Sequence, residues 1–271
     1  MKSARVNDYE MRYIEVGEGP PLVLVHGSLG DYRVWSPVQG PLSRHHKVIA
    51  VSLRHYFPEH WDGKDGRFTI AQHVDDMITF IEQLDLGPVR LCGHSRGGHI
   101  AFRIAQQRPD LIEKLILAEP GGTLDASLAP NTSADTPSFA RLYVDEASKR
   151  IAAGDIDGGL RTFKDAIDGD GAWMSLPAAE RQLRRDNAFT LLAQTHEQRQ
   201  PYTRSDAESI SVPTLFVGGA ETPGMLPVVL KALSSHVQGA EVIMIADATH
   251  VMFVQQPEQF CKAVLDFLGR G

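Results

Sequence analysis

A serine lies at the centre of the most informative pentapeptide of this chain. Gly93-His94-Ser95-Arg96-Gly97 matches the pattern G-x-S-x-G, after an apolar run at 89–92 and before a helical pattern that begins at Ile100. A strand, a sharp turn and a helix around a central serine are typical of a nucleophile elbow, in which a strained turn presents the hydroxyl above a sheet. We therefore predict that Ser95 is a nucleophile. A glycine-rich turn whose serine only caps the helix is the alternative interpretation.

A serine hydroxyl is a weak nucleophile until an adjacent base takes its proton. His250 is the candidate base, because it lies in the loop after the last predicted strand. A carboxylate would hold the imidazole in the required tautomer and stabilise the imidazolium. Two glutamates compete for this role: Glu119 directly follows the strand pattern at 115–118, and Glu221 follows the one at 213–217. We favour Glu119, because no other carboxylate lies near the end of its strand.

The tetrahedral intermediate of acyl transfer needs hydrogen-bond donors for its oxyanion. The backbone amide of Arg96 is one candidate, and the amide of Ser28 in the turn His26-Gly27-Ser28 is the other. Loss of one such donor typically costs about 2.7–4 kcal/mol of transition-state stabilisation. Since Ser28 would act through its backbone, we expect its side chain to matter less. We expect His26 to support the turn by hydrogen bonding.

Three residues near these positions are predicted to contact the substrate: Leu29, His94 and Trp173. Trp173 is chosen among the apolar and aromatic residues of the region after Glu119 because it lies in a glycine-rich loop. The side chain of Arg96 has two interpretations, since it either binds an acidic group of the substrate or forms an ion pair at the start of its helix.

The elements that must position these residues alternate along the chain. Strand patterns occur at 48–52, 89–92, 114–118, 213–217 and 241–246, and helical patterns at 70–84 and 258–268. Strands that alternate with helices predict an α/β fold with a mostly parallel sheet covered on both faces. Strand patterns at 9–17 and 21–26 are joined by a turn, Gly17-Glu18-Gly19-Pro20, which predicts an antiparallel edge.

The interval 121–211 breaks this alternation. It opens with a loop rich in Gly, Ser, Pro and Asn over 121–137 and shows no convincing strand. Helical patterns follow near 138–153, 157–167 and 178–198. We predict a helical cap over 121–211, inserted into a core that is formed by residues 1–120 and 212–271. A long ordinary crossover between two core strands is the alternative.

Composition limits the classes of partner. The chain has 271 residues and a net charge of −7, with 27 Lys and Arg against 34 Asp and Glu, so we expect no nucleic-acid binding. It has no apolar run of about 18 residues, so we expect no membrane span. Two cysteines and no apolar N-terminal stretch favour the cytoplasm. Histidine spacing matches no zinc pattern, and nucleotide motifs are missing, so we expect no metal and no cofactor. The sequence is compatible with a homodimer.

The chain resembles the α/β-hydrolase superfamily along nearly its whole length, through its G-x-S-x-G pentapeptide and the order Ser95, Glu119, His250. Within it, the chain looks most like small cap-bearing esterases and lactone hydrolases. Ala118-Glu119-Pro120 and the segment 219–223 are similar to the turns after strands six and seven of fungal zearalenone lactone hydrolases. In most of the superfamily the acid follows strand seven, three residues after a glycine. In this chain that position is Thr222 if the count starts at Gly219, and Glu221 if it starts at Gly218.

The resemblance implies a function as well as an α/β-hydrolase fold with a cap between strands six and seven. It implies a cofactor-free serine hydrolase that cleaves a carboxylic ester or lactone of a small to medium, mostly apolar substrate through an acyl-enzyme. A C–C bond hydrolase of a diketone would use the same triad, and a receptor-like member would bind a small ligand with little turnover. The sequence does not separate these, because specificity depends on the shape of the pocket.

Overall fold

An eight-stranded sheet forms the centre of the molecule in the computed structural model, which describes residues 1–64, 66–129 and 139–269. The strands follow one another across the sheet in the order β1-β2-β4-β3-β5-β6-β7-β8. Their bounds are β1 Lys2–Val6, β2 Tyr9–Val16, β3 Pro21–Val25, β4 Lys47–Ser52, β5 Val89–His94, β6 Ile112–Ala118, β7 Thr214–Gly219 and β8 Glu241–Ile245. From β4 to β8 all neighbours are parallel, which confirms the predicted α/β fold with a mostly parallel sheet.

The expected antiparallel edge is present, but its strands pair differently from the expectation. β2 pairs antiparallel with β4 and with β1, whereas β3 lies on the other side of β4 and pairs with it in parallel. The turn after β2 therefore does not close a hairpin. It crosses the end of β4, where the amide of Lys47 donates to the carbonyl oxygen of Pro20 at 3.1 Å. β1 was not predicted, because its largely exposed residues give a weak apolar signal.

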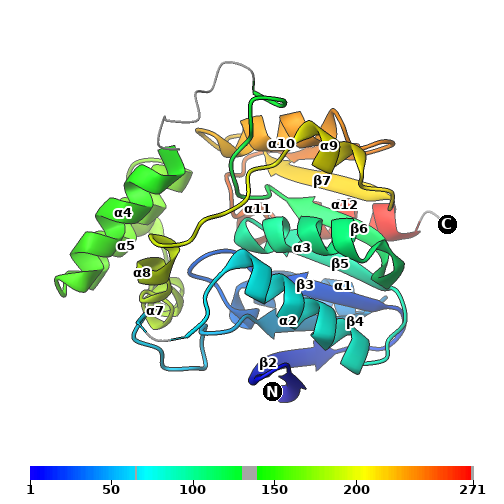
Figure 1. Cartoon of the computed structure of the whole chain (residues 1–271), viewed down its shortest axis with the longest axis horizontal. Helices are drawn as coiled ribbons and strands as arrows, with labels where there is room; N and C mark the ends of the chain where they lie inside the picture. Colours follow the sequence, from blue (N-terminus) through cyan, green and yellow to red (C-terminus); the bar gives the residue numbers. More distant parts are fainter. Residues whose placement is uncertain (65, 130–138, 270–271) are drawn as a thin grey trace.

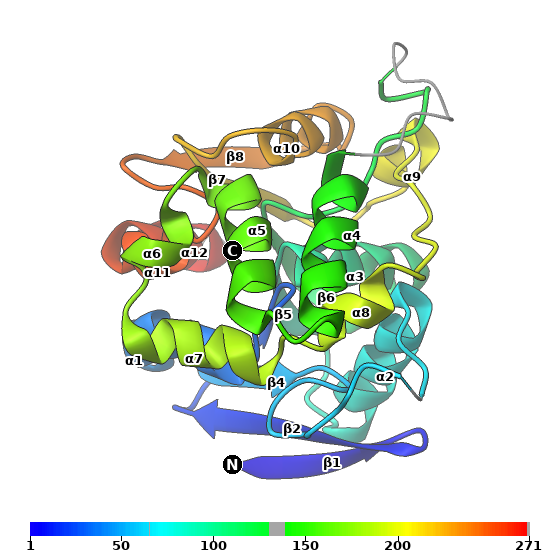
Figure 2. The ribbon, with the colours of Figure 1, turned by 90° about the vertical axis from the view of Figure 1, so that its left-hand side faces the viewer.

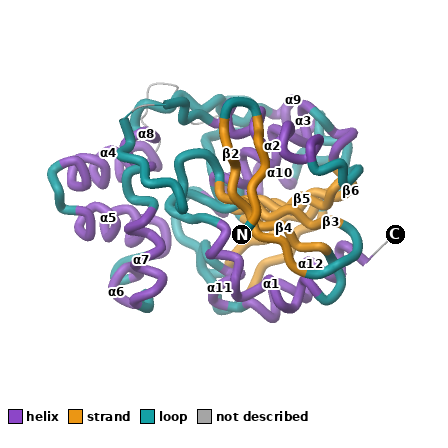
Figure 3. Tube along the Cα trace, turned by 90° about the horizontal axis from the view of Figure 1, so that it is seen from below, coloured by secondary structure: helices purple, strands orange, loops and turns teal. Residues whose placement is uncertain are grey.

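Helices cover both faces of the sheet (Figure 3). The helices α2 (Ile70–Gln83), α3 (Arg96–Gln107) and α10 (Leu226–Ser234) pack on one face, and α1 (Ser36–Ser43), α11 (Met252–Gln255) and α12 (Pro257–Gly269) on the other. Alternation along β3 shows how one strand serves both layers. Val23 and Val25 belong to the first core, and Leu22 and Leu24 to the second, since successive side chains of a strand point to opposite faces.

A separate group of helices lies between β6 and β7 in the chain, within residues 121–211, which we call the insertion. Its helices are α4 Phe139–Ala152, α5 Ile156–Asp168, α6 Ala172–Ser175, α7 Ala178–Asp186, α8 Thr190–Gln194 and α9 Arg204–Glu208. Figure 1 places α4, α5, α7 and α8 to the left of the sheet, and Figure 2 shows them from that side. The loop predicted over 121–137 lies outside the described residues from position 130 onward.

The single helix expected near 178–198 is two helices, α7 and α8. Asn187 ends α7, and its side chain is used in contacts with the core: its amide nitrogen donates to Asp31 at 2.7 Å and its amide oxygen accepts from the backbone of Phe57 at 2.8 Å. Tertiary contacts of this residue thus coincide with the break between the helices. No helix in the described ranges has both the length and the apolar character that a membrane span requires.

Candidate active site

Ser95 lies in the sharp turn between β5 and α3 with a backbone φ of 53° and ψ of −116°. A non-glycine residue at positive φ costs of the order of 1–3 kcal/mol and typically marks a functional position. Hydrogen bonds hold the turn in place, because the Ser95 amide donates to Ala118 at 3.0 Å and its carbonyl accepts from Gly121 at 2.8 Å and from His99 at 3.0 Å. The strained elbow expected at this serine is present.

Glycines make this close packing of strand and helix possible. A Cβ at Gly93 would lie within 2.8 Å of Ala101 Cβ and collide with the carbonyl of Gly97. A Cβ at Gly98 would lie 2.8 Å from Cα of Pro120. Both distances are shorter than side-chain atoms tolerate, so the elbow depends on the missing side chains at these positions.

Glu119 and His250 meet at the carboxyl end of the sheet. Nδ1 of His250 donates to Oε2 of Glu119 at 2.7 Å, and the exposed fractions of the two residues are 4% and 0%. Because Nδ1 carries the proton in this bond, Nε2 is left as an acceptor. Ser95 and His250 line the same cavity. The arrangement can therefore accept a proton on the cavity side while the carboxylate stabilises the imidazolium.

Glu221, the competing acid, is exposed. Its neighbour Thr222 is buried and donates from Oγ1 to Oε1 of Glu119 at 2.7 Å. The amide of Gly219 donates to the same oxygen at 2.8 Å. The last residue of β7 and the loop after it, the region in which the resemblance places the usual acid, here supply the two donors that hold the carboxylate which follows β6.

The turn His26-Gly27-Ser28 lies directly against the serine. A Cβ at Gly27 would lie 2.8 Å from Cβ of Ser95, so only glycine allows this approach. The His26 ring holds the turn: Nε2 accepts from the amide of Leu53 at 3.1 Å, and Nδ1 donates to the carbonyl of Gly27 at 2.8 Å. Burial lowers the pKa of His26 to about 4, which keeps the ring neutral in this role.

Two amides next to Ser95 are available to a ligand. Neither the amide of Ser28 nor that of Arg96 donates to an acceptor in the described part of the chain. The Arg96 amide lies at the N-terminus of α3, where unpaired N–H groups and the helix dipole favour negative charge. The predicted donors are thus unused within residues 1–64, 66–129 and 139–269.

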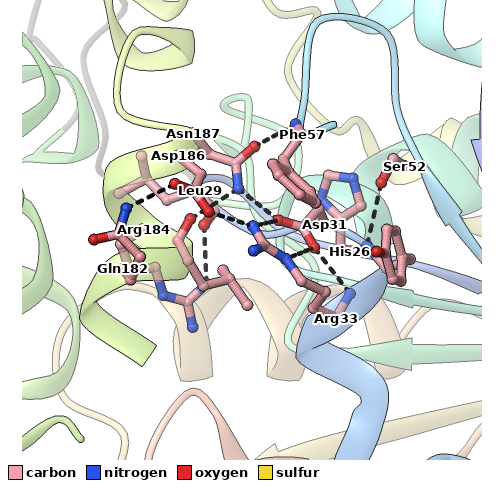
Figure 4. Close-up of polar contacts among 12 residues, drawn as sticks. His26, Leu29, Asp31, Arg33, Ser52, Phe57, Gln182, Arg184, Asp186 and Asn187 are labelled. Atoms are coloured by element: carbon pink, nitrogen blue, oxygen red, sulfur yellow. Dashed lines mark hydrogen bonds and ion pairs between the residues drawn. The ribbon is translucent and has the colours of Figure 1, made fainter. Parts of the chain in front are cut away.

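Contacts from α7 hold the loop that follows Ser28 (Figure 4). Nη1 of Arg184 donates to the carbonyl of Leu29 at 3.1 Å, and Leu29 has a φ of 58°. Asp31, which is fully buried, accepts from Arg33 at 2.8 Å and from Asn187 at 2.7 Å. Arg33 also donates to Asp186 at 2.8 Å. The strained loop beside the serine is therefore fastened to the insertion.

A second set of contacts joins the insertion to the elbow through the side chain of Arg96. Its guanidinium donates to both carboxylate oxygens of Glu197 at 2.6 Å, and both side chains are fully buried. Arg199 donates to Glu197 at 2.7 Å and to Gln194 at 2.8 Å. Gln194 in turn accepts from the Ser28 hydroxyl at 2.9 Å. Of the two interpretations of the Arg96 side chain, the structure shows the ion pair.

The cavity between core and insertion has a volume of about 550 Å³, open solvent at its mouth included. Leu29, His94 and Trp173, which we predicted to contact substrate, all line it. His94 also supports the base, because its Nε2 donates to the carbonyl of His250 at 2.9 Å. Burial lowers the pKa of His94 well below its usual range, so this ring is neutral.

Sequence reasoning missed three charged residues of the cavity wall: Lys164, Asp168 and Arg184. A signal was available for the first two, since they lie on the same helix face as Leu160 and Phe163 at spacings of three and four residues. Thr222, which lies at the position of the usual strand-seven acid by one count, cannot act as an acid, and its role as a donor to Glu119 was not predicted. Within the described ranges, no cluster of three or more His, Cys, Asp or Glu is arranged to hold a metal ion.

With this geometry established, comparison with known proteins defines the class. A family model described as the alpha/beta hydrolase family matches residues 22–263. The chain therefore belongs to the alpha/beta hydrolase family. This confirms the resemblance at the level of the superfamily, and the narrower resemblance to zearalenone lactone hydrolases stays a prediction.

The individual proteins that are similar to this chain have low sequence identity to it. A thermophilic esterase from Thermogutta terrifontis has a TM-score of 0.79 at 21% identity, covering 100% of this chain and 99% of that one. The enol-lactonase from Burkholderia xenovorans LB400 has a TM-score of 0.78 at 21% identity, covering 99% and 100%. An uncharacterized protein of Mycobacterium tuberculosis is 31% identical over 117 residues, which are 43% of this chain and 34% of that protein. The match thus spans about a third of this curated relative.

Proposed function

We propose that the protein is a serine hydrolase that cleaves a carboxylic ester or a lactone through an acyl-enzyme, with Ser95, His250 and Glu119 as its triad. The observation that carries this proposal is the buried hydrogen bond from His250 to Glu119 beside the strained Ser95. Esterases and a lactonase among proteins of the same fold agree with it.

In the proposed mechanism, Nε2 of His250 takes the proton of the Ser95 hydroxyl as the oxygen attacks the carbonyl carbon. Glu119 stabilises the imidazolium that forms. His250 then returns the proton to the leaving alcohol oxygen, and the acyl group stays on Ser95. A water molecule, activated by the same imidazole, releases the acid and restores the serine.

The amides of Ser28 and Arg96 are the proposed donors to the oxyanion. Gly27 lies against the Ser95 side chain, which supports a position for the Ser28 amide close to the reacting carbon. The unpaired amide of Arg96 follows the nucleophile directly. Preorganised backbone donors of this kind act on the charge that develops in the transition state.

The insertion is proposed as the cap of the site. Its helices α5 and α7 and the residue Trp173 of α6 supply one wall of the cavity, opposite the triad. A wall of this kind limits the contact of the site with bulk solvent and selects the substrate by shape.

The test measures fluorophosphonate labelling and ester turnover of the wild-type protein and of one variant. A fluorophosphonate should label the protein at Ser95, and Ser95→Ala should lose both the label and esterase turnover by several orders of magnitude, leaving the background from binding and the oxyanion donors. Hydrolysis should be measured with a panel of uncharged alkyl esters and lactones.

Retained labelling at another residue would show that the serine assignment is wrong. Labelling of Ser95 without turnover of any ester or lactone would favour a diketone as substrate or a ligand-binding role. Normal activity in the Ser95→Ala variant would exclude the whole mechanism.

A further inference from the structure

One face of α5 forms part of the wall of the cavity that Ser95 and His250 line. Its lining side chains are Leu160, Phe163, Lys164, Ile167 and Asp168. Spacings of three and four residues place all five on one side of the helix. Two of them are charged in a row that is otherwise apolar, and charged side chains are rarely buried without a partner.

Lys164 and Asp168 form a buried ion pair. Nζ of Lys164 lies 2.6 Å from Oδ2 of Asp168, and the exposed fractions of the side chains are 10% and 4%. Oδ1 of Asp168 accepts from the hydroxyl of Thr249 at 2.7 Å, one residue before His250. Asp168 thus uses both oxygens. The ammonium of Lys164 has three donors, and among described residues it uses one.

Arg184 reaches the same cavity from α7. Nη1 donates to the carbonyl of Leu29 at 3.1 Å, and Nη2 lies 3.6 Å from the carboxylate of Glu180, too far for a hydrogen bond. A guanidinium has five N–H donors in a planar fork. Within the described part of the chain, one of the five has an acceptor.

The two cations are close enough to affect each other. Burial lowers the pKa of Lys164, and the charge of Arg184 lowers it further, against the opposing effects of Asp168 and Glu180. Both cations also lower the pKa of His94, which flanks the nucleophile. Their charges therefore act at the reacting end of the cavity as well as at its wall.

Two cations and one carboxylate belong to the described lining, namely Lys164, Arg184 and Asp168. The second carboxylate, Glu180, lies 3.6 Å from Arg184 outside the lining, so the cavity surface itself carries more positive than negative groups. Both cations keep N–H donors that have no acceptor among the described residues, and an anionic group of a ligand in the cavity would accept from them. A carboxylate fits best, because it accepts two parallel hydrogen bonds from a guanidinium and carries one charge.

We propose that Lys164 and Arg184 bind a carboxylate of the substrate, so that the substrate is a mostly apolar ester or lactone with one acidic group away from the bond that is cleaved. This inference rests on the proposed hydrolase function. It assigns to the wall of the insertion the contact with an acidic group that the sequence left open for Arg96, whose side chain is occupied by Glu197.

The experiment compares esters that differ in one group. Monoethyl adipate carries a carboxylate on the acyl side and O-hexanoylglycolate on the alcohol side, and ethyl hexanoate carries none. Hydrolysis is followed by proton release. We expect kcat/KM of the wild-type protein to be at least tenfold higher for one of the two acidic esters than for ethyl hexanoate.

Three variants locate this preference. Lys164→Met and Arg184→Met should each reduce the ratio of kcat/KM between the preferred acidic ester and ethyl hexanoate by about tenfold to a hundredfold, the range expected of a charge-assisted hydrogen bond. The ratio cancels effects that both substrates share. Arg161→Met is the matched control, because it removes a charge from the exposed side of α5, where the side chain is 61% exposed, and should leave the ratio unchanged.

A second measurement needs no turnover. Adipate should protect Ser95 of the wild-type protein from fluorophosphonate at concentrations at least tenfold lower than hexanoate does, since the two differ only by the second carboxylate. If neither acidic ester is preferred and adipate protects no better than hexanoate, the carboxylate site is wrong while the hydrolase function stands. If Ser95 is not labelled and no ester is cleaved, the proposed function itself fails.

Discussion

The core and the insertion use their polar side chains differently on the two sides of the cavity. On the core side, Glu119 and His250 bond to each other, and Nε2 of His250 has no hydrogen-bond partner among the described residues. Ser95 and His250 line the same cavity. On the insertion side, buried polar groups bond to the core: Glu197 bonds to Arg96 at the start of α3, and Asn187 to Asp31. The core carries the groups that can react, and the contacts of the insertion fix the conformation of the backbone around these groups.

This difference leads to a general expectation about how variants in the two regions affect turnover and stability. An amide in place of the Glu119 carboxylate should lower turnover far more than the free energy of unfolding, because its oxygen can still accept from Gly219 and Thr222. Variants in the contacts between insertion and core should lower stability first and turnover as a consequence. The following predictions test this division from the largest effect on turnover to the smallest.

Glu119→Gln should reduce kcat by about 10⁴, the effect of the equivalent change in a serine protease, because the imidazolium loses its counter-charge. Glu221→Gln is the matched control and should cost far less, since Glu221 is exposed. Both are measured on one ester after their thermal midpoints are shown to be equal. If Glu221→Gln loses activity and Glu119→Gln keeps it, Glu221 after β7 is the catalytic acid. The hydrogen bond from His250 to Glu119 would then not be the catalytic one.

Gly27→Ala should reduce kcat by about 10²–10³, the range for loss of one oxyanion donor. The new methyl would lie 2.8 Å from Cβ of Ser95 and must push the turn that carries the Ser28 amide. Gly40→Ala in α1 is the control, because no atom lies within 4 Å of its added Cβ; it should keep full activity. Equal activity of the two variants would show that the turn is not part of the site.

Glu197→Gln should destabilise the fold by about 3–5 kcal/mol, since it leaves the buried Arg96 without its counter-charge. Turnover of the folded fraction should fall about tenfold, because the ion pair fixes the residue after Ser95. Glu113→Gln removes an ion pair with Arg90 at a 42% exposed carboxylate and should change stability by less than about 1 kcal/mol. Denaturant unfolding of both variants measures the difference.

The Glu197 effect should depend on pH. Burial alone would raise the pKa of Glu197, but the charges of Arg96 and Arg199 hold it well below its ordinary value of 4.5. The stability that the ionised carboxylate adds is therefore fully present above about pH 4.5 and is lost as the pH falls below it. The gap in unfolding free energy between wild type and Glu197→Gln should narrow over that window; a constant gap would contradict the ionised pair.

Ser28→Ala should have the smallest effect, less than about tenfold in kcat. The backbone amide remains, and the loss is one neutral hydrogen bond to Gln194, worth about 0.5–1.5 kcal/mol. KM and kcat are measured on the same ester as for the Gly27→Ala variant. A loss as large as that of Gly27→Ala would mean that the hydroxyl, rather than the amide, contacts the reacting group.

Local patterns in the sequence were enough for the elbow and for most of the sheet. The pentapeptide around Ser95 and the strand before it involve neighbours within about ten residues, and helix and strand periodicities act over the same range. The order of Ser95, Glu119 and His250 along the chain was predictable as well, because each of these residues follows a strand that local patterns indicate. The antiparallel edge predicted from the strands at 9–17 and 21–26 is present, but its pairing is different, because β2 pairs with β1 and β4 and the choice of partner is made by the whole sheet.

Only the tertiary structure decided which side chains meet. Glu119 rather than Glu221 bonds His250 because the backbone after β6 and β7 turns one carboxylate inward and leaves the other exposed. Arg96 meets Glu197 across 101 residues of chain, which no local pattern encodes. The sequence by itself determined the elements and the candidate groups, through short-range sterics and apolar periodicity. Packing of the insertion against the core decided their partners, because burial makes each unpaired polar group costly and so selects one arrangement.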